Sequence, residues 1–306
     1  MGFVLRPSSR LQVHCWGGLG SQMYAWALFE RLEIRFPNRK LKLIFHTGGV
    51  TKRLPDLEPL FTAGQKGFVQ DFVSQEATNE FATVARESAS GIKKALVKIG
   101  KRALLATGFV ATANNEAEFS KVKPWVVSIR GHYSELKIDL TTIKLMQDRA
   151  GKSNSLLQFD LQQKPNLDVL HYRLGDLMEL AEKGPNSTKS ISAAITDAGL
   201  GVARELWVLS DSPQVAIDLL HKENPQLRLK LDEGNLNAWQ SLMAMTNAST
   251  LVGTSSKLSI WAMIFRSYFS ETARTYIPAQ VQHHARANLG EKELLRIRFY
   301  LPKTPK

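Results

Sequence analysis

Residues 11–35 read LQVHCWGGLGSQMYAWALFERLEIR, and this stretch gives the first indication of the fold. Its apolar start, Leu11 to Cys15, predicts a short β-strand, and the glycines within residues 17–20 predict a turn. The run from Gln22 to Arg35 has apolar side chains at helical spacing and predicts an α-helix. A strand, a glycine loop and a helix in this order are typical of an α/β fold.

The same alternation continues along the rest of the chain. Apolar runs predict further strands, and amphipathic runs predict the helices between them. The predicted strands are residues 41–46, 125–129, 167–171, 206–209, 227–231 and 250–252. The predicted helices are residues 190–200, 214–221 and 237–246, with a further helix through residues 261–265.

The length and a polar stretch in the middle predict two domains. The chain has 306 residues, and domains average roughly 100–200 residues. A polar stretch from Lys152 to Pro165 separates the two patterned halves, so we place the linker at about residues 150–166. The sequence therefore predicts two α/β halves, residues 1–155 and 156–306, with a cleft between them.

The composition indicates a folded and basic protein. An apolar content of 43% excludes a disordered chain. The 40 Lys and Arg residues exceed the 28 Asp and Glu residues, which gives a net charge of +12. Such a charge suits nucleic acid, an anionic membrane surface or a phosphorylated ligand, and the charge by itself does not choose among them.

The cysteine content and the lack of long apolar runs predict an intracellular protein. Cys15 is the one cysteine of the sequence, which excludes an intrachain disulfide framework. No apolar run approaches the ~18–20 residues that span a bilayer. Arg6 and Pro7 stand where a signal peptide would have its apolar core, so neither a membrane-spanning nor a secreted protein is expected.

Residues 91–104 predict a basic amphipathic helix, because apolar side chains recur there at helical spacing. Its basic residues are Lys93, Lys94, Lys98, Lys101 and Arg102. Either they are solvated on an ordinary surface helix, or they contact an anionic membrane.

The glycine loop at residues 16–22 is a candidate binding element. Backbone N–H groups at the start of a helix can receive an anion, and Gly17, Gly18 and Gly20 would let a ligand approach the backbone. The spacing does not match the dinucleotide fingerprint GxGxxG, and no Lys-Ser or Lys-Thr pair completes a P-loop. The alternative is that the loop is simply a tight turn.

A second candidate lies at the end of the strand predicted at residues 167–171. In an open α/β sheet ligands bind outside the carboxyl ends of the strands, which is where His171, Arg173 and Asp176 fall. Arg173 offers a planar fork of donors to a diphosphate. The alternatives are a structural ion pair between Arg173 and Asp176, and a core histidine at His171.

Two further loops follow the same plan. Asp211 comes after the strand at residues 206–209, where it could accept hydrogen bonds from a ribose or a base, or cap the helix that starts at Pro213. The hydroxyl-rich loop at residues 253–259 could bind phosphate, or one of its serines could be an ordinary N-cap. One cleft ligand that carries phosphates accounts for all of these loops.

Five blocks resemble the family 11 glycosyltransferases, the α-1,2-fucosyltransferases. GGLGSQM at residues 17–23 resembles the family's GGLGNQMF, and IRGHYSE at residues 129–135 resembles G-Y-x-Q-S-E. HYRLGD at residues 171–176 resembles H-x-R-R-G-D, and VLSD at residues 208–211 resembles F-S-D-D. TSSKLSIW at residues 254–261 resembles N-S-S-F-S-W-W, so the blocks stand in the family's order.

The resemblance implies a GT-B fold, in which two Rossmann-like domains face a central cleft. It also implies inverting transfer of fucose from GDP-fucose to a sugar hydroxyl, without a metal and without a further cofactor. The C-terminal domain would hold the nucleotide-sugar donor, and the N-terminal domain would lie on the acceptor side.

The resemblance assigns roles to particular residues. Arg173 would grip the donor diphosphate, His171 and Asp176 would shape that site, and Asp211 would face the nucleoside. The family implies catalytic roles for Arg173, Asp176 and His171, and Glu179 is a further candidate for the general base. The donor-binding set is Gly17, Gly18, Gly20, Gln22, Arg173, Asp211, Thr254, Ser255, Ser256 and Ser259.

Some positions depart from the family pattern. Leu174 replaces the second arginine of H-x-R-R-G-D, Ser21 replaces the asparagine before Gln22, and Lys257 interrupts the serine block. The alternatives are therefore a different nucleotide sugar, or a homologue that binds nucleotide or glycan without catalysis. Nucleic-acid binding rests on charge alone, because the sequence shows no helix-turn-helix, zinc or RNP-like motif.

The expected partners and location follow from the same resemblance. The acceptor would be a glycan or a lipid-linked oligosaccharide in surface polysaccharide synthesis. The enzyme would be cytoplasmic, and residues 93–102 would give it a peripheral contact with the cytoplasmic face of the inner membrane.

Overall fold

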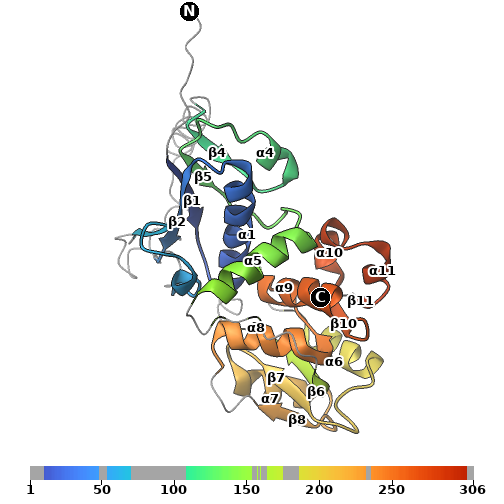
Figure 1. The fold of residues 1–306 in the computed structure, drawn as a ribbon. Coiled ribbons are helices and arrows are strands. Elements are labelled where there is room, and N and C mark those ends of the chain that lie inside the picture. The colour runs from blue at the N-terminus through green and yellow to red at the C-terminus, as the bar shows by residue number, and fades with distance from the viewer. Residues whose placement is uncertain are drawn as a thin grey trace, which may run out of the picture. The chain divides into compact units, whose positions relative to one another are not determined.

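The computed structural model describes residues 10–47, 54–69, 108–153, 157, 159, 164–174, 186–231 and 236–301 (Figure 1). The basic segment with Lys93, Lys94, Lys98, Lys101 and Arg102 lies outside these ranges, and so do Asp176 and Glu179. The chain divides into two compact units, Met1–Gln158 and Phe159–Lys306. This division lies close to the boundary expected after residue 155.

The first unit is built on a parallel sheet. Within the described ranges its five strands follow the order β3-β2-β1-β5-β4, and every neighbouring pair is parallel. The strands are β1 (Arg10–Cys15), β2 (Lys40–His46), β3 (Lys66–Val69), β4 (Val110–Thr112) and β5 (Ser128–Arg130). The helical segments are α1 (Leu19–Arg35), η1 (Glu58–Leu60), α4 (Glu116–Ser120) and α5 (Leu140–Lys152).

Helix α1 is the central packing element of this unit (Figure 1). Met23, Tyr24, Trp26 and Phe29 on this helix are fully buried, because it packs on β1 and β2 and is covered by α5. A helix that is apolar on most of its faces must be buried on most of them. The strand–loop–helix predicted at residues 11–35 is therefore confirmed, and the helix begins at Leu19 rather than at Gln22.

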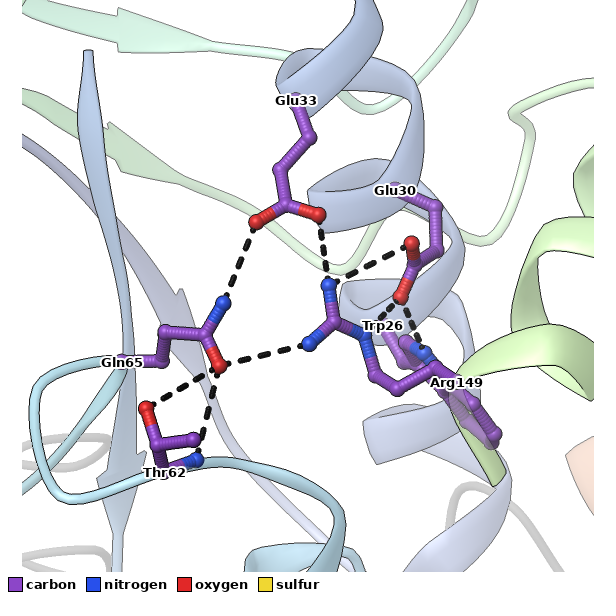
Figure 2. A network of polar contacts seen from close by, with 6 residues as sticks. All are labelled: Trp26, Glu30, Glu33, Thr62, Gln65 and Arg149. Carbon is purple, nitrogen blue, oxygen red and sulfur yellow. Dashed lines mark hydrogen bonds and ion pairs between the residues drawn. The ribbon is translucent and has the colours of Figure 1, made fainter. Parts of the chain in front are cut away.

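A polar network fastens α1 to α5 and to the loop before β3 (Figure 2). Arg149 of α5 forms an ion pair with Glu30, donates to Glu33 Oε2 at 2.5 Å, and donates to Gln65 Oε1 at 3.3 Å. Glu30 also accepts the indole N–H of Trp26 at 2.7 Å. Burial raises the pKa of Glu30, and its hydrogen bond and charge interaction with Arg149 oppose that rise.

The second unit is also a parallel sheet, with six strands in the order β11-β10-β9-β6-β7-β8 among its described residues. Counted from the first strand along the chain, this is the 3-2-1-4-5-6 order of a Rossmann fold, and the order reverses between β6 and β9. The strands are β6 (Lys164–His171), β7 (Leu206–Leu209), β8 (Leu229–Leu231), β9 (Ala248–Val252), β10 (Arg274–Pro278) and β11 (Ile297–Tyr300).

The helices of the second unit follow the strands, as the alternation in the sequence predicts. They are α6 (Thr188–Asp197), α7 (Pro213–Glu223), α8 (Ala238–Asn247), α9 (Lys257–Phe269), η3 (Ala279–Val281), α10 (Gln282–Asn288) and α11 (Glu291–Leu294). Asn237 starts α8 through a capping box with Gln240. Both units are thus Rossmann-like α/β units, which confirms the predicted fold class.

Two strands are shorter than predicted. The strand expected at residues 125–129 is β5, which begins at Ser128, and the strand expected at residues 227–231 is β8, which begins at Leu229. Leu227 is apolar because its side chain packs into the core of the second unit. Because Leu227 is apolar and Arg228 is polar, the alternating pattern begins two residues before the strand itself.

None of the helices in the described ranges combines the length and the apolar character that crossing a membrane requires.

Candidate functional site

The carboxyl ends of three neighbouring strands bring polar residues together in the second unit. Strands β7, β6 and β9 are adjacent and parallel, so the residues after Leu209, His171 and Val252 lie at one edge of the sheet. This edge includes the place where the strand order reverses, between β6 and β9. Open α/β sheets bind ligands outside the carboxyl ends of their strands at such a point.

His171, the last residue of β6, contacts the serine loop that follows β9. Its Nδ1 lies 2.7 Å from Ser259 Oγ and 3.3 Å from Ser256 Oγ, and its side chain is buried. Burial lowers the pKa of His171 to about 4, the charge of Asp211 opposes this shift, and the charge of Arg173 adds to it. The imidazole is therefore neutral near pH 7 and links two elements that the sequence places far apart.

The serine loop forms the start of α9. Ser256 is the N-cap, and its Oγ accepts the N–H of Ser259 at 3.1 Å, so the N-cap alternative is correct for Ser256. The N–H of Thr254 donates to Ser259 Oγ at 3.2 Å. A Cβ at Gly253 would lie 3.0 Å from the Cβ of Ser259, which explains a glycine at this close approach.

Thr254 contributes a buried hydroxyl at the same place. Its side chain is 2% exposed, and its Oγ1 has no hydrogen-bond partner among the residues that the structure describes. A buried hydroxyl without a partner is costly, and such groups are usually paired with protein, water or a ligand. Thr254 Oγ1 is thus a polar group of the serine loop that a bound anion could satisfy.

Asp211 is joined to the segment that follows β6. Its Oδ1 accepts the backbone N–H of Leu174 at 2.8 Å. Helix α7 has Ser212 as its N-cap, so Asp211 is not the N-cap residue of this helix. Asp211 instead stabilises the loop that presents Arg173.

Arg173 stands between two anchored neighbours. The N–H of Tyr172 donates to Leu209 O at 2.9 Å, and the Tyr172 hydroxyl lies 2.8 Å from Thr188 Oγ1. Leu174 on the other side is fully buried in the core of the second unit. Arg173 itself is half-buried at the edge, so its backbone is fixed while part of its side chain reaches solvent.

Leu174 belongs to the core of the second unit. Its side chain packs among Leu170, Tyr172, Ile191 and other core residues, away from solvent. Burial of a leucine side chain stabilises the fold by about 1.5–3 kcal/mol, and a charged side chain would not contribute this free energy. Leucine at position 174 therefore fits the packing of this chain, and the positive charge of the motif's second arginine is absent from this position.

Asn186 also lies at this edge, and none of the motifs in the sequence includes it. Its Oδ1 accepts the N–H of Ser255 at 3.0 Å and the Ser255 hydroxyl at 3.2 Å. Its Nδ2 donates to Gln280 Oε1 at 3.2 Å. Asn186 thus connects the serine loop with the segment after β10. The only local signal in the sequence is the run Asn-Ser-Thr at residues 186–188, which predicts the start of a helix and not a site.

The glycine loop belongs to the first unit. Gly17 has a φ of +85°, which favours glycine, and Gly18 is the N-cap of α1. Gln22 is buried, and its Nε2 donates to Gly17 O at 3.0 Å and to Leu54 O at 2.7 Å. Its Oε1 accepts the N–H of Leu57 at 3.2 Å, so Gln22 fastens the loop to residues 54–57 of its own unit.

The predicted site residues therefore fall into separate groups. His171, Arg173, Asp211 and the serine loop gather at one edge of the second unit, whereas Gly17, Gly18, Gly20 and Gln22 lie in the first. Within the described part of the chain, no three His, Cys, Asp or Glu side chains form a group that could hold a metal ion.

The neutral state of His171 predicts a pH dependence of stability. Its pKa of about 4 in the folded chain lies below its ordinary value of 6.5, and burial lowers the pKa of His14 to about 4 as well. Unfolding therefore takes up protons as the pH falls from 6.5 toward 4, so the stability present above pH 6.5 should decline in this window. Urea unfolding at a series of pH values measures the decline.

A pair of variants tests whether the titration of His171 causes the loss of stability at low pH. His171→Asn should flatten part of the decline, and replacement of the exposed His283 by asparagine should leave it unchanged. Equal pH slopes in the parent chain and in His171→Asn would show that His171 is not the group that titrates.

Comparisons with known proteins found solved structures that resemble this chain at low sequence identity. No protein-family model and no curated protein matches the chain. The structure of E. coli heptosyltransferase WaaC with ADP matches with a TM-score of 0.40 and 9% identity, over 95% of this chain and 92% of that one. The family 9 glycosyl transferase from Veillonella parvula matches with a TM-score of 0.39 and 10% identity, over 88% and 80% of the two chains.

A third likeness is the structure of POFUT1 in complex with GDP-fucose. Its TM-score is 0.38 and its identity 12%, over 90% of this chain and 99% of that one. All three scores are below 0.5, so the fold assignment rests on the strand order of this chain and the functional argument on its own residues.

Proposed function

We propose that this chain is a glycosyltransferase that binds a nucleotide-sugar donor at the carboxyl edge of its second unit. The observation that carries the proposal is the meeting of His171, Arg173, Asp211 and the serine loop where the strand order reverses. This is the place at which doubly wound sheets bind nucleotides. The resemblance of the same residues to the motifs of a fucosyltransferase family supports the same function.

The chemistry of this edge suits a diphosphate. Arg173 carries a planar fork of N–H donors that fits two phosphate oxygens. The N-terminus of α9, a helix of 13 residues, adds backbone N–H groups and the positive end of the helix dipole. Thr254 Oγ1 adds a buried hydroxyl without a partner in the described residues.

The finer proposal is inverting transfer of fucose from GDP-fucose, without a metal. The acceptor hydroxyl would attack the anomeric carbon on the face opposite the diphosphate, lose its proton to a general base, and form the new C–O bond. The bond between the anomeric carbon and the phosphate oxygen would break, and its electron pair would leave with the diphosphate. Arg173 and the amides of α9 would stabilise that negative charge.

His171 is better suited to positioning than to acting as the general base. Its Nδ1 already contacts the hydroxyls of Ser256 and Ser259, and its low pKa makes it a weak base near pH 7. We assign it to holding the serine loop in place. Asp176 and Glu179 remain the proposed candidates for the base, and the proposed acceptor is a glycan or a lipid-linked oligosaccharide.

The test is a transfer assay with a panel of donors. The intact chain is incubated with GDP-fucose, GDP-mannose, UDP-galactose, UDP-glucose or dTDP-rhamnose and a mixture of glycoside acceptors, and the released nucleoside diphosphate is measured. The proposal expects acceptor-dependent release from GDP-fucose. Release from another donor alone would replace fucose, and no release from any donor despite nucleotide binding would favour a non-catalytic homologue.

A further inference from the structure

Tyr300, the last residue of β11, contacts the serine loop from the edge strand of the second sheet. Strand β11 pairs with β10, and β10 pairs with β9, so Tyr300 stands two strands away from the end of β9. Its hydroxyl donates to the carbonyl oxygen of Gly253, the first residue after β9, at 2.7 Å. The motifs in the sequence do not include Tyr300, and the site described above does not use it.

The Tyr300 side chain packs against the hydrophobic core of the second unit. Burial raises the pKa of Tyr300 above its ordinary value, and the charge interaction with Tyr172 adds to this rise. The phenol is therefore protonated near pH 7 and acts as a hydrogen-bond donor. A phenol in such surroundings needs a polar partner, and Gly253 O is that partner.

The peptide group between Gly253 and Thr254 is hydrogen-bonded at both ends. Its carbonyl oxygen accepts the Tyr300 hydroxyl, and its N–H donates to Ser259 Oγ at 3.2 Å. Because a peptide group is planar, the two bonds together fix its orientation. Without Tyr300 the group would keep the bond at its N–H, beside a glycine, which restricts backbone rotation least.

The orientation of this peptide group determines the direction of the Thr254 side chain. Thr254 follows the group directly, and its Oγ1 is the buried hydroxyl without a partner among the described residues. On the other side of Thr254, Asn186 Oδ1 accepts the N–H of Ser255 at 3.0 Å. Thr254 is thus held between two anchored neighbours, Gly253 and Ser255.

We propose that Tyr300 is a positioning residue of the proposed donor site, because its hydroxyl fixes the Gly253–Thr254 peptide group and thereby aims the Thr254 hydroxyl at the donor diphosphate. The inference rests on the proposed function, since it concerns the same edge of the second unit. Phosphate oxygens accept hydrogen bonds from hydroxyl groups, and a nucleoside lacks these oxygens. A donor that is already oriented costs less to order when the anion binds, so loss of its anchor should weaken recognition of the phosphates.

The experiment measures the phosphate-dependent affinity of the intact chain by calorimetric titration. The ligand is whichever of GDP, UDP and ADP the parent chain binds most tightly, and the corresponding nucleoside is titrated beside it. Tyr300→Phe keeps the ring and removes the hydroxyl, so it should weaken binding of the diphosphate about three- to tenfold and leave binding of the nucleoside unchanged. An unchanged affinity for the diphosphate would overturn the inference.

Tyr268→Phe is the matched control. Tyr268 is also half-buried, and its hydroxyl also donates to a backbone carbonyl, that of Asn288, at 2.6 Å. It lies near the end of α9, whereas the serine loop lies at the start of this helix. Both variants should lose similar free energy of unfolding in urea, but only Tyr300→Phe should lose affinity for the diphosphate. Equal losses of affinity would mean that Tyr300 only stabilises the fold.

A double-mutant cycle with Thr254→Val tests whether Tyr300 acts through Thr254. Valine has the shape of threonine and lacks Oγ1, so Thr254→Val should itself weaken the diphosphate. Tyr300→Phe should then cause no further loss in the Thr254→Val chain, and additive losses would overturn the inference. If Tyr300→Phe does not fold, Thr254→Val decides alone, because an unchanged diphosphate affinity in that variant contradicts the role of Thr254.

Failure of this inference and failure of the proposed donor site give different results. No binding of GDP, UDP or ADP by the parent chain would refute the donor site, and the role of Tyr300 with it. A parent chain that binds a diphosphate, together with a Tyr300→Phe chain that binds it equally well, would refute only the role of Tyr300.

Discussion

Replacing Arg173 by alanine is expected to reduce turnover by about 10²–10³-fold while the protein stays folded. The guanidinium is the strongest cationic group proposed to face the donor diphosphate, and one such donor removed from a preorganised site costs this much. The fold should survive because Tyr172 and Leu174 anchor the segment through the core and through backbone hydrogen bonds. The loss of turnover is measured as kcat/KM with the active donor, and the integrity of the fold is measured by a thermal unfolding curve.

Two further substitutions sharpen this result. Arg173→Lys keeps the charge but loses the fork of donors, so its activity should fall between those of the parent and Arg173→Ala. Arg228→Ala removes an equal charge from the exposed residue before β8, at the opposite edge of the same sheet, and should leave turnover unchanged. If Arg173→Ala keeps turnover within a few-fold of the parent, the role given to Arg173 is wrong.

Replacing Arg149 by methionine is expected to destabilise the first unit by about 3–5 kcal/mol. Methionine keeps an apolar stem, so the change removes the guanidinium group with its hydrogen bonds and its contacts with the rings of Phe29 and Phe61. Glu30, a buried residue of α1, then keeps the hydrogen bond from the Trp26 indole but loses the cation that offsets its burial (Figure 2). The free energy of unfolding from urea titration gives the size of the loss.

Arg31→Met is the matched control for this prediction. Arg31 lies on the same helix as Glu30 and pairs with Glu116 at 2.6 Å, but the Glu116 side chain is 45% exposed. An ion pair with an exposed partner contributes about 0–1 kcal/mol, so the loss should be much smaller. Losses of equal size in the two variants would mean that burial of the Arg149 network does not determine its contribution.

Local patterns predicted the alternation of strands and helices well. The glycine turn after β1, the capping box before α8 and the N-cap of α9 depend on residues within one or two turns of each other. Periodicity therefore located the elements that it predicted to within a few residues, but it predicted no strand at β3, β4, β10 or β11 and no helix at α5. It failed at β5 and β8, where an apolar residue ahead of the strand packs into the core without pairing in the sheet.

The contacts that build the candidate sites join residues far apart in the sequence. His171 meets Ser259, Leu174 meets Asp211, and Ser255 meets Asn186, in each case across neighbouring strands or their loops. The motifs indicated most of these residues, but their partners depend on the strand order. Asn186 was missed for this reason, since no local spacing connects it with Ser255.

Leu174 shows that a motif comparison does not reveal how a side chain packs. Compared with the family motif, leucine at this place indicates a missing positive charge at the donor. In the structure the side chain is a fully buried member of the core, and its backbone N–H donates to Asp211. The residue thus serves the same edge through packing and through a main-chain hydrogen bond.

The central claim is that the carboxyl edge of the second unit binds a nucleoside diphosphate, and calorimetric titration of the intact chain tests it most directly. The account predicts that GDP binds, that guanosine without phosphates binds far more weakly, and that Arg173→Ala removes most of this difference. A preference for UDP or ADP would change the donor and leave the site in place. Equal affinity for GDP and guanosine, or no binding of GDP, UDP or ADP, would contradict the account.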